Sequence, residues 1–440
     1  MKPNPDQTYS KNYRRYVLFL LTIVYAFNFI DRQILVVLQE SIKADMDLSD
    51  SQLGLLTGFA FAVFYVSLGI PIARWADSGN RRNIVAGAVT IWSGMTAISG
   101  LAQNYVQLLL ARIGVGVGEA GGSPPSHAMI SDYYPAEERG RAMSLYSMGV
   151  YVGILVGYGL GGLIAQYYGW RVAFFAVGIP GLLIAVLVRF TIREPIRGAM
   201  DGPGATGKST LKETVATLWA LRSFRLYSVG TGLIAFVSYG VGNFLPSFLG
   251  RSHGFDHVQI GTSLMLVAGI GGAIGTFLGG YFADKLGQRD IRWYLWVPAI
   301  PAIFVPLLNV LGVFAETSNA ALGYLFVATM AGALYLGPTI AITHSLVSPS
   351  MRAMSSAILF LILNLIGLGL GPLAVGILSD LLSSTYGIDS LRYAISWVSL
   401  AGLVAVALFF LAARHLPGDM KQSKALIDNE SAMNTEEAKA

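Results

Sequence analysis

The sequence has no cysteine and few charged residues. The absence of cysteine from 440 residues excludes disulfides, thiolate metal sites and cysteine nucleophiles. Charged residues make up only 12% of the chain, and its 5 histidines are dispersed. An enzyme needs a nucleophile beside a base, or clustered carboxylates and histidines, and no such group stands out. We therefore predict that the protein is not an enzyme and that it holds no metal and no cofactor.

Long apolar runs are what the sequence has in excess. Hydrophobic residues make up 54% of the chain and the mean hydropathy is +0.58. The runs are about 20 residues or longer, as a helix crossing a bilayer requires, whereas strands of a membrane barrel would be about half as long. This predicts an all-α integral membrane protein. We expect twelve spans, at 16–38, 52–75, 83–102, 105–130, 141–165, 171–190, 224–249, 258–283, 293–313, 321–346, 353–381 and 391–413.

The basic residues indicate how the spans are oriented. Of 30 Lys and Arg residues, only Lys43, Arg171, Arg251 and Arg392 lie in the predicted outer loops or at the outer ends of spans, and only Arg32 and Arg112 lie more than two residues inside a span. Such a bias predicts that both termini lie in the cytoplasm. We expect the protein to lie in the inner (plasma) membrane. The net charge of +5 therefore follows topology and does not indicate nucleic-acid binding. The first apolar stretch is too long for a signal peptide and lacks a cleavage site, so it should remain a membrane helix.

A polar connection at 191–223 divides six spans from six. We predict a first bundle at 1–190, a second at 224–413 and a cytoplasmic tail at 414–440. The stretch LKETVATLWALRSF, in the second half of this linker, is amphipathic enough to lie on the membrane surface or to pack against the cytoplasmic face of the protein. The segments 73–82 and 280–289 repeat one pattern, as expected when two six-helix bundles surround a central cavity.

Two local patterns are set aside. Residues 202–209, GPGATGKS, match the phosphate-loop pattern, but they follow no buried strand and stand in a loop too short for a nucleotide-binding domain. His253 and His257 could share a metal by spacing and lie beside Asp256. Because a third ligand cluster is missing, we interpret that segment as a solvated outer loop.

Four charged residues interrupt apolar spans and form the leading site hypothesis. Arg112 and Glu119 lie seven residues apart, on one face of a helix, and Asp31-Arg32 interrupts the first span. Asp31 and Arg112 both fall about 10 Å from the outer ends and should pair, whereas Glu119 should lie alone near mid-membrane. The hypothesis is that Asp31 and Glu119 exchange protons while Arg32 and Arg112 alternate between these carboxylates and an anionic substrate group.

The spans and two loop motifs together resemble the major facilitator superfamily. The pattern G-x-L-A-D-[RK]-x-G-[RK]-[RK] is matched well at 280–289 and partly at 73–82, where Ala73 and Ser78 depart from it. The resemblance implies that an acid in each copy meets the start of a helix in the other half and closes the cytoplasmic side. The gate residues so implied are Asp77, Arg81, Arg82, Asp284, Lys285 and Arg289.

A glycine-rich stretch in the fifth span is similar to the antiporter motif of the superfamily. In GILVGYGLGG, at 153–162, Tyr158 stands where the motif has proline, which weakens any inference of antiport. Glycines at this spacing also let helices approach closely whatever the mechanism.

More narrowly, the sequence looks like a bacterial member of the Spinster family of lipid transporters. The resemblance rests on Asp31-Arg32, on ARIGVGVGEAG in the fourth span and on GLGLGPLAVGILSD at 367–380. It implies a lysophospholipid or a sphingosine-1-phosphate-like substrate, and proton coupling as in bacterial relatives. Polar residues on helices that line the cavity in this superfamily are Asn28, Tyr65, Tyr151, Asn243, Tyr335 and Asn364.

The expected function is therefore secondary transport by alternating access, by a monomer whose partners are substrate, protons and the lipid bilayer. A small organic anion or a drug is the alternative cargo. A substrate-sensing receptor on the same fold is an alternative of another class, which counterflow of labelled substrate would separate from a transporter.

Overall fold

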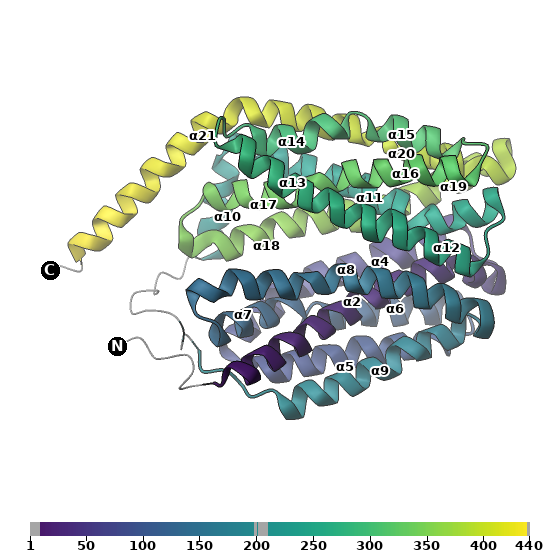
Figure 1. The fold of residues 1–440 in the computed structure, drawn as a ribbon, viewed down its shortest axis with the longest axis horizontal. Coiled ribbons are helices and arrows are strands. Elements are labelled where there is room, and N and C mark those ends of the chain that lie inside the picture. The colour runs from purple at the N-terminus through teal and green to yellow at the C-terminus, as the bar shows by residue number, and fades with distance from the viewer. Residues whose placement is uncertain (1–8, 198–199, 201–209, 438–440) are drawn as a thin grey trace. The chain divides into compact units, whose positions relative to one another are not determined.

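The chain is built from helices (Figure 1). The computed structural model describes residues 9–197, 200 and 210–437, and this part contains no strand, which confirms the predicted all-α class. Nine stretches of the described chain are long and apolar enough to cross a membrane, while the count of twelve stays a prediction. The elements are α2 (Lys11–Met46), α3 (Asp50–Gly54), η1 (Leu55–Phe59), α4 (Ala60–Ser78), α5 (Arg81–Ser99), α6 (Tyr105–Glu119), α7 (Ser123–Tyr133), α8 (Ala136–Tyr168), α9 (Trp170–Thr191), α10 (Leu211–Ala220), α11 (Arg222–His253), α12 (His257–Leu264), η2 (Met265–Gly271), α13 (Gly272–Gly287), α14 (Trp293–Ala302), α15 (Val305–Val313), α16 (Ser318–Gly332), η3 (Ala333–Tyr335), α17 (Leu336–Ser345), η4 (Pro349–Met351), α18 (Arg352–Leu363), η5 (Asn364–Leu370), α19 (Gly371–Tyr386), η6 (Gly387–Asp389), α20 (Ser390–Ser399) and α21 (Ala401–Glu437).

Polar side chains mark where several helices begin. Ser49, Thr210 and Asp256 each accept a hydrogen bond from a backbone N–H three residues later, and the residue at that position returns a bond to the cap. These capping boxes satisfy N–H groups that have no partner inside the helix. The pKa of Glu213 lies below its usual value because its carboxylate accepts the N–H of Thr210. The start of each of these helices is therefore determined by residues close to it in the sequence.

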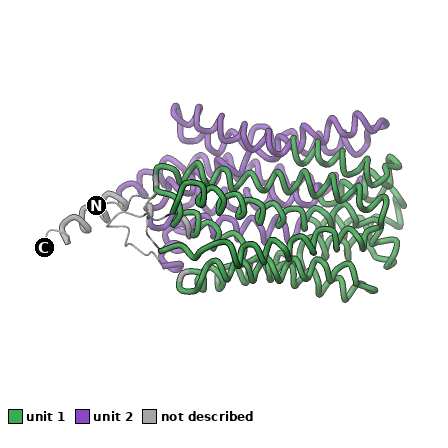
Figure 2. The backbone as a smooth tube through the Cα atoms, turned by 60° about the horizontal axis from the view of Figure 1, so that its bottom comes forward, with its two compact units in different colours: residues 1–205, 243–270, 372–391 green, residues 206–242, 271–371, 392–440 purple. Residues whose placement is uncertain are grey.

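The chain packs into two compact units (Figure 2). Unit 1 comprises Met1–Ala205, Asn243–Ile270 and Pro372–Leu391, and unit 2 comprises Thr206–Gly242, Gly271–Gly371 and Arg392–Ala440. The units therefore do not follow chain order, because segments of α11, α12 and α19 pack with the N-terminal part. The predicted division at the 191–223 linker stays a prediction.

In unit 1, α8 lies directly against α2. A Cβ atom placed on Gly153 would come within 2.4 Å of the carbonyl oxygen of Ala26, and one on Gly149 within 2.7 Å of that of Thr22. Only glycine fits at such distances, so the glycine-rich stretch at 153–162 serves close helix packing, as expected from its spacing.

In unit 2, the linker helix α10 belongs to the core. Leu218 of α10 is fully buried in a cluster with Phe224 and Phe409, and α10 contacts α18. Of the two placements considered for the amphipathic stretch, the structure shows packing against the protein. Residues 202–209, which carry the phosphate-loop pattern, lie outside the described residues. The predicted tail at 414–440 continues helix α21 as far as Glu437.

The span predicted at 105–130 consists of two helices. Helix α6 ends at Glu119 and α7 begins at Ser123. Pro124 and Pro125 have no N–H to continue the ladder of α6, and Gly121 and Gly122 close the turn with bonds to carbonyls three residues back. Glu119 therefore lies at the end of a helix.

Candidate functional site

Asp31 of α2 and Arg112 of α6 form a buried ion pair. Arg112 Nη1 lies 2.9 Å from Asp31 Oδ1, and the two side chains are 2% and 1% exposed. Thr96 of α5 donates its hydroxyl hydrogen to the other carboxylate oxygen. The predicted pairing of Asp31 with Arg112 is therefore present, while their depth in the membrane stays a prediction. Asp31 therefore links α2 to α6 through Arg112 and to α5 through Thr96. Separating these helices would leave a buried charge without its partner, which is energetically costly.

Arg32 and Glu119 form a second pair. Glu119 Oε2 lies 2.8 Å from Arg32 Nε and 2.6 Å from Arg32 Nη2, and the side chains are 14% exposed for Arg32 and 0% for Glu119. The expectation that Glu119 lies alone is wrong. Neighbouring residues of a helix point about 100° apart, so Asp31 faces Arg112 while the long side chain of Arg32 reaches the end of α6.

Three aromatic rings surround the Arg32 guanidinium group. Its central carbon lies 5.2 Å from the ring centroid of Phe29, 4.7 Å from that of Phe61 and 5.1 Å from that of Tyr65. The Phe61 ring is also 5.9 Å from the guanidinium carbon of Arg112. Such cation–π contacts stabilise a desolvated guanidinium group, so Arg32 keeps favourable contacts without Glu119.

Two polar atoms of the site lack partners. Glu119 Oε1 and Arg112 Nε are buried and have no hydrogen-bond partner among the described residues. An unpartnered carboxylate oxygen in a low-dielectric interior is where a proton adds most readily. The site thus holds two arginines and two carboxylates, whose charges cancel, and Glu119 Oε1 is the oxygen that can accept a proton.

Glycines of α6 bring the charged residues to their partners. A Cβ atom on Gly116 would lie 2.7 Å from the carbonyl oxygen of Phe61, and one on Gly118 would lie 2.5 Å from the backbone nitrogen of Trp92. The backbone of α6 therefore touches both α4 and α5. This contact sets Arg112 beside Asp31 and the Phe61 ring, and Glu119 beside Arg32.

A family model described as Major Facilitator Superfamily matches residues 21–372 and 227–433. The chain belongs to the major facilitator superfamily. It is a membrane transporter of this superfamily, with the all-helical fold that the family implies.

Within the superfamily, the chain is similar to one solved structure and to two named transport proteins. The chain is similar to the crystal structure of a bacterial homologue of the human lysosomal transporter Spinster, in an inward-facing and unoccupied conformation. That match has 34% identity and a TM-score of 0.87, and it covers 93% of this chain and 99% of the other. An MFS-type efflux pump of Mycolicibacterium smegmatis is 33% identical over 405 residues, 91% of this chain and 93% of the pump. A cis,cis-muconate transport protein of Acinetobacter baylyi is 29% identical over 275 residues, 61% of this chain and 65% of that protein.

The predicted cavity residues divide between the two units. In unit 1, Tyr65 contacts Arg32, Asn28 is buried on α2, and Asn243 accepts a 2.7 Å hydrogen bond from Gln39 at its backbone oxygen. Tyr151 lies half-buried on α8. Tyr335, in η3, and Asn364, in η5, belong to unit 2. Tyr65 is brought to the charged site by its contact with Arg32.

Arg81 and Arg82, predicted gate residues of the superfamily motif, hold the start of α5. Arg81 forms an ion pair with Asp132 of α7. The backbone N–H groups of Arg81 and Arg82 each donate to Glu194, at 2.8 Å, which caps the positive end of the α5 dipole. The side chain of Asp77, the acid of this copy, lies outside the described part.

The second copy of the motif lies at the end of α13, in unit 2. Asp284 accepts a 2.9 Å hydrogen bond from Tyr294, and Lys285 lies 5.6 Å from the ring of Tyr281. Arg289 closes the turn that follows α13 by a backbone bond to Leu286. The gating roles of both copies stay predictions.

Histidine and aspartate in the predicted loop at 253–257 have structural partners. Asp256 caps α12, and His257 contacts Ser41 through Nε2 at 2.9 Å. Thr96, Phe29 and Phe61 also belong to the site and were not among the predicted residues. In the sequence each is an apolar or small residue within a span, a pattern that does not distinguish it from a residue that only packs.

Proposed function

We propose that the protein is a proton-coupled secondary transporter that moves an amphiphilic lipid with an anionic headgroup by alternating access. It would act in the inner membrane with both termini in the cytoplasm. The observation that carries the proposal is the set of two buried ion pairs, Asp31–Arg112 and Arg32–Glu119, in which one oxygen of Glu119 has no partner within the described part of the chain. Ionisable groups inside a membrane protein mark substrate and proton pathways.

Protonation of Glu119 is the proposed switch. A proton on Oε1 neutralises the carboxylate and weakens its bonds to Arg32, which the rings of Phe29, Phe61 and Tyr65 still hold. Arg32 is then available to an anionic headgroup. If proton and substrate bind the two access states with different affinities, each biases the state that the other meets.

Asp31 and Arg112 form the second part of the proposed switch. Their side chains are more deeply buried than that of Arg32, and Thr96 adds a hydrogen bond to the carboxylate. Asp31 would exchange its proton only in a state where water reaches it. In the conformation described, this pair holds the helices together.

The lipid assignment is supported by the similarity to Spinster proteins, and a small organic anion is the second candidate. The likeness to a muconate transport protein supports that alternative, because muconate also carries carboxylates. Uptake assays in proteoliposomes, with a lysophospholipid and with muconate at equal concentration, separate the two. The cargo class is that of the compound that is taken up and whose uptake an equal concentration of the other compound does not reduce.

The proton switch is tested by Glu119→Gln. Glutamine keeps the shape and the hydrogen bonding but cannot change charge, so we expect counterflow of labelled substrate to persist while stimulation by a pH gradient is lost. Glu138→Gln is a matched control, because Glu138 is 54% exposed and pairs with Arg14 outside the site. Transport by Glu119→Gln that responds to the gradient as strongly as the control would show that Glu119 does not carry the proton.

A further inference from the structure

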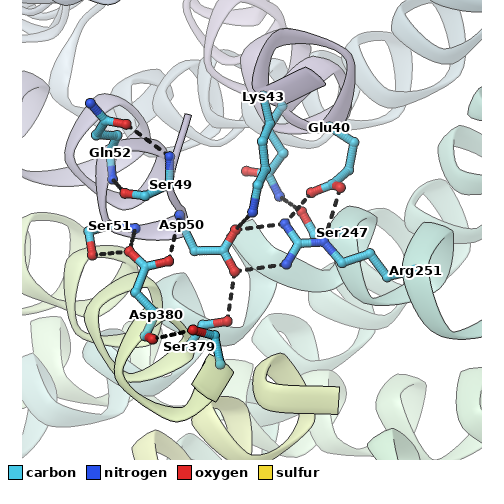
Figure 3. Close-up of polar contacts among 12 residues, drawn as sticks. Glu40, Lys43, Ser49, Asp50, Ser51, Gln52, Ser247, Arg251, Ser379 and Asp380 are labelled. Atoms are coloured by element: carbon cyan, nitrogen blue, oxygen red, sulfur yellow. Dashed lines mark hydrogen bonds and ion pairs between the residues drawn. The ribbon is translucent and has the colours of Figure 1, made fainter. Parts of the chain in front are cut away.

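A second group of charged residues gathers at the helix ends that are predicted to face outward (Figure 3). Arg251, near the end of α11, lies between two carboxylates. Its Nε and Nη2 atoms are 3.0 and 2.6 Å from the oxygens of Glu40, on α2. Its Nη1 and Nη2 atoms are each 2.7 Å from an oxygen of Asp50, the first residue of α3. One guanidinium group therefore joins three helices.

Helix α19 completes the group. Asp50 also accepts from Lys43 Nζ at 2.5 Å and from Ser379 Oγ at 2.6 Å. In return, the carboxylate of Asp380 accepts the backbone N–H groups of Asp50, at 3.0 Å, and Ser51, at 2.8 Å. Asp380 thus caps the start of α3 from another helix, as Figure 3 shows. We call Glu40, Lys43, Asp50, Arg251, Ser379 and Asp380 the charged clasp.

The backbones at the clasp are in direct contact. A Cβ atom on Gly376 of α19 would lie 2.2 Å from the carbonyl oxygen of Asp50. One on Gly54 of α3 would lie 2.4 Å from the carbonyl oxygen of Pro372. There is room for no side chain between these helices, so the clasp residues lie at a closed junction.

Two helix ends in the clasp, those of α11 and α19, are continuous in the chain with residues of unit 2. Residues 222–242 of α11 and residues 271–371, which lead into α19, belong to unit 2, whereas the clasp ends of α11 and α19 belong to unit 1. We propose that the charged clasp closes one side of the transporter and opens during the transport cycle, with Arg251 as its central residue. Ionic groups suit a contact that must break, because water rehydrates each charge on opening, whereas exposed apolar surface would oppose it.

This inference is independent of the lipid and of the proton switch, and it is tested without either. The chain has no natural cysteine, so Ser247→Cys gives a single reactive thiol. Ser247 is fully buried one turn before Arg251 and accepts a 2.7 Å bond from Gln39. The measurement is the labelling rate of this thiol by a charged maleimide, on purified protein in detergent. Adding Asp50→Asn should raise the rate on the order of tenfold, because the charge-assisted bonds to Arg251 and Lys43 are weakened.

Asp45→Asn is the matched control. Asp45 also pairs with an arginine, Arg171 at 2.8 Å, but both side chains are 41% exposed, so the labelling rate should not change. Gly376→Ala opens the junction by steric clash and leaves every charge in place, so it should raise the rate as well. Equal rates in the Asp50, Gly376 and Asp45 variants overturn the proposal, and so does a rate that rises in the Asp45 variant alone. If Asp50→Asn does not fold, the Gly376 variant decides by itself.

Discussion

At the scale of single residues, the Asp31–Arg112 pair makes a strong prediction about stability. Arg112→Met leaves Asp31 buried without a cation, which should lower the free energy of unfolding by about 3–5 kcal/mol. Adding Asp31→Leu removes the orphan charge and should return thermal stability to near its original value. Thermal melting in detergent measures both. Transport should be lost in both variants. If the double variant is as unstable as Arg112→Met alone, the lost stability does not come from the unpaired charge of Asp31.

The same residues show what a sequence can and cannot predict about the site. Asp31 and Arg112 were paired correctly, because depth in the membrane follows from counting residues along two spans. Arg32 and Glu119 were not, since their contact depends on the direction of adjacent side chains on α2 and on the end of α6 at Glu119. The ring of Phe61 leaves no mark in the sequence that distinguishes it from a core residue.

At the scale of elements, the packing of α8 on α2 predicts opposite effects for two glycines of one helix. Gly153→Ala places a methyl group against the backbone of Ala26 and should lower the free energy of unfolding by about 1–3 kcal/mol. Gly140→Ala, also on α8, meets no atom within 4 Å, and should raise it by about 0.5–1 kcal/mol because alanine favours helix. Melting temperatures of both variants in one detergent test this. A melting temperature for Gly153→Ala at or above that of Gly140→Ala would contradict the packing argument.

Helix positions were predicted well from the sequence, and helix ends less well. Apolar runs of membrane length locate helices because the bilayer leaves few other structures available. The run at 105–130 does not reveal that α6 stops at Glu119, although the Gly-Gly-Ser-Pro-Pro stretch in it is a strong breaker. The ionic contacts of Arg251 were also unforeseen, since an arginine at the end of a span looks like a loop residue until α2, α3 and α19 are placed around it.

At the scale of the whole molecule, the distribution of lysine and arginine predicts a single orientation, and the lack of cysteine makes it measurable. Exposed Ser78, the last residue of α4, should face the cytoplasm, while exposed Ala44 and Ser384 should face outward. Single cysteines at Ala44 and Ser384 should react with an impermeant maleimide in intact cells. A cysteine at Ser78 should react only after the membrane is permeabilised. Reaction at Ser78 in intact cells would reverse the topology and place the charged clasp on the cytoplasmic side. The clasp would then still close one side of the transporter, and Asp31 and Arg112 would still share one depth, counted from the cytoplasmic side.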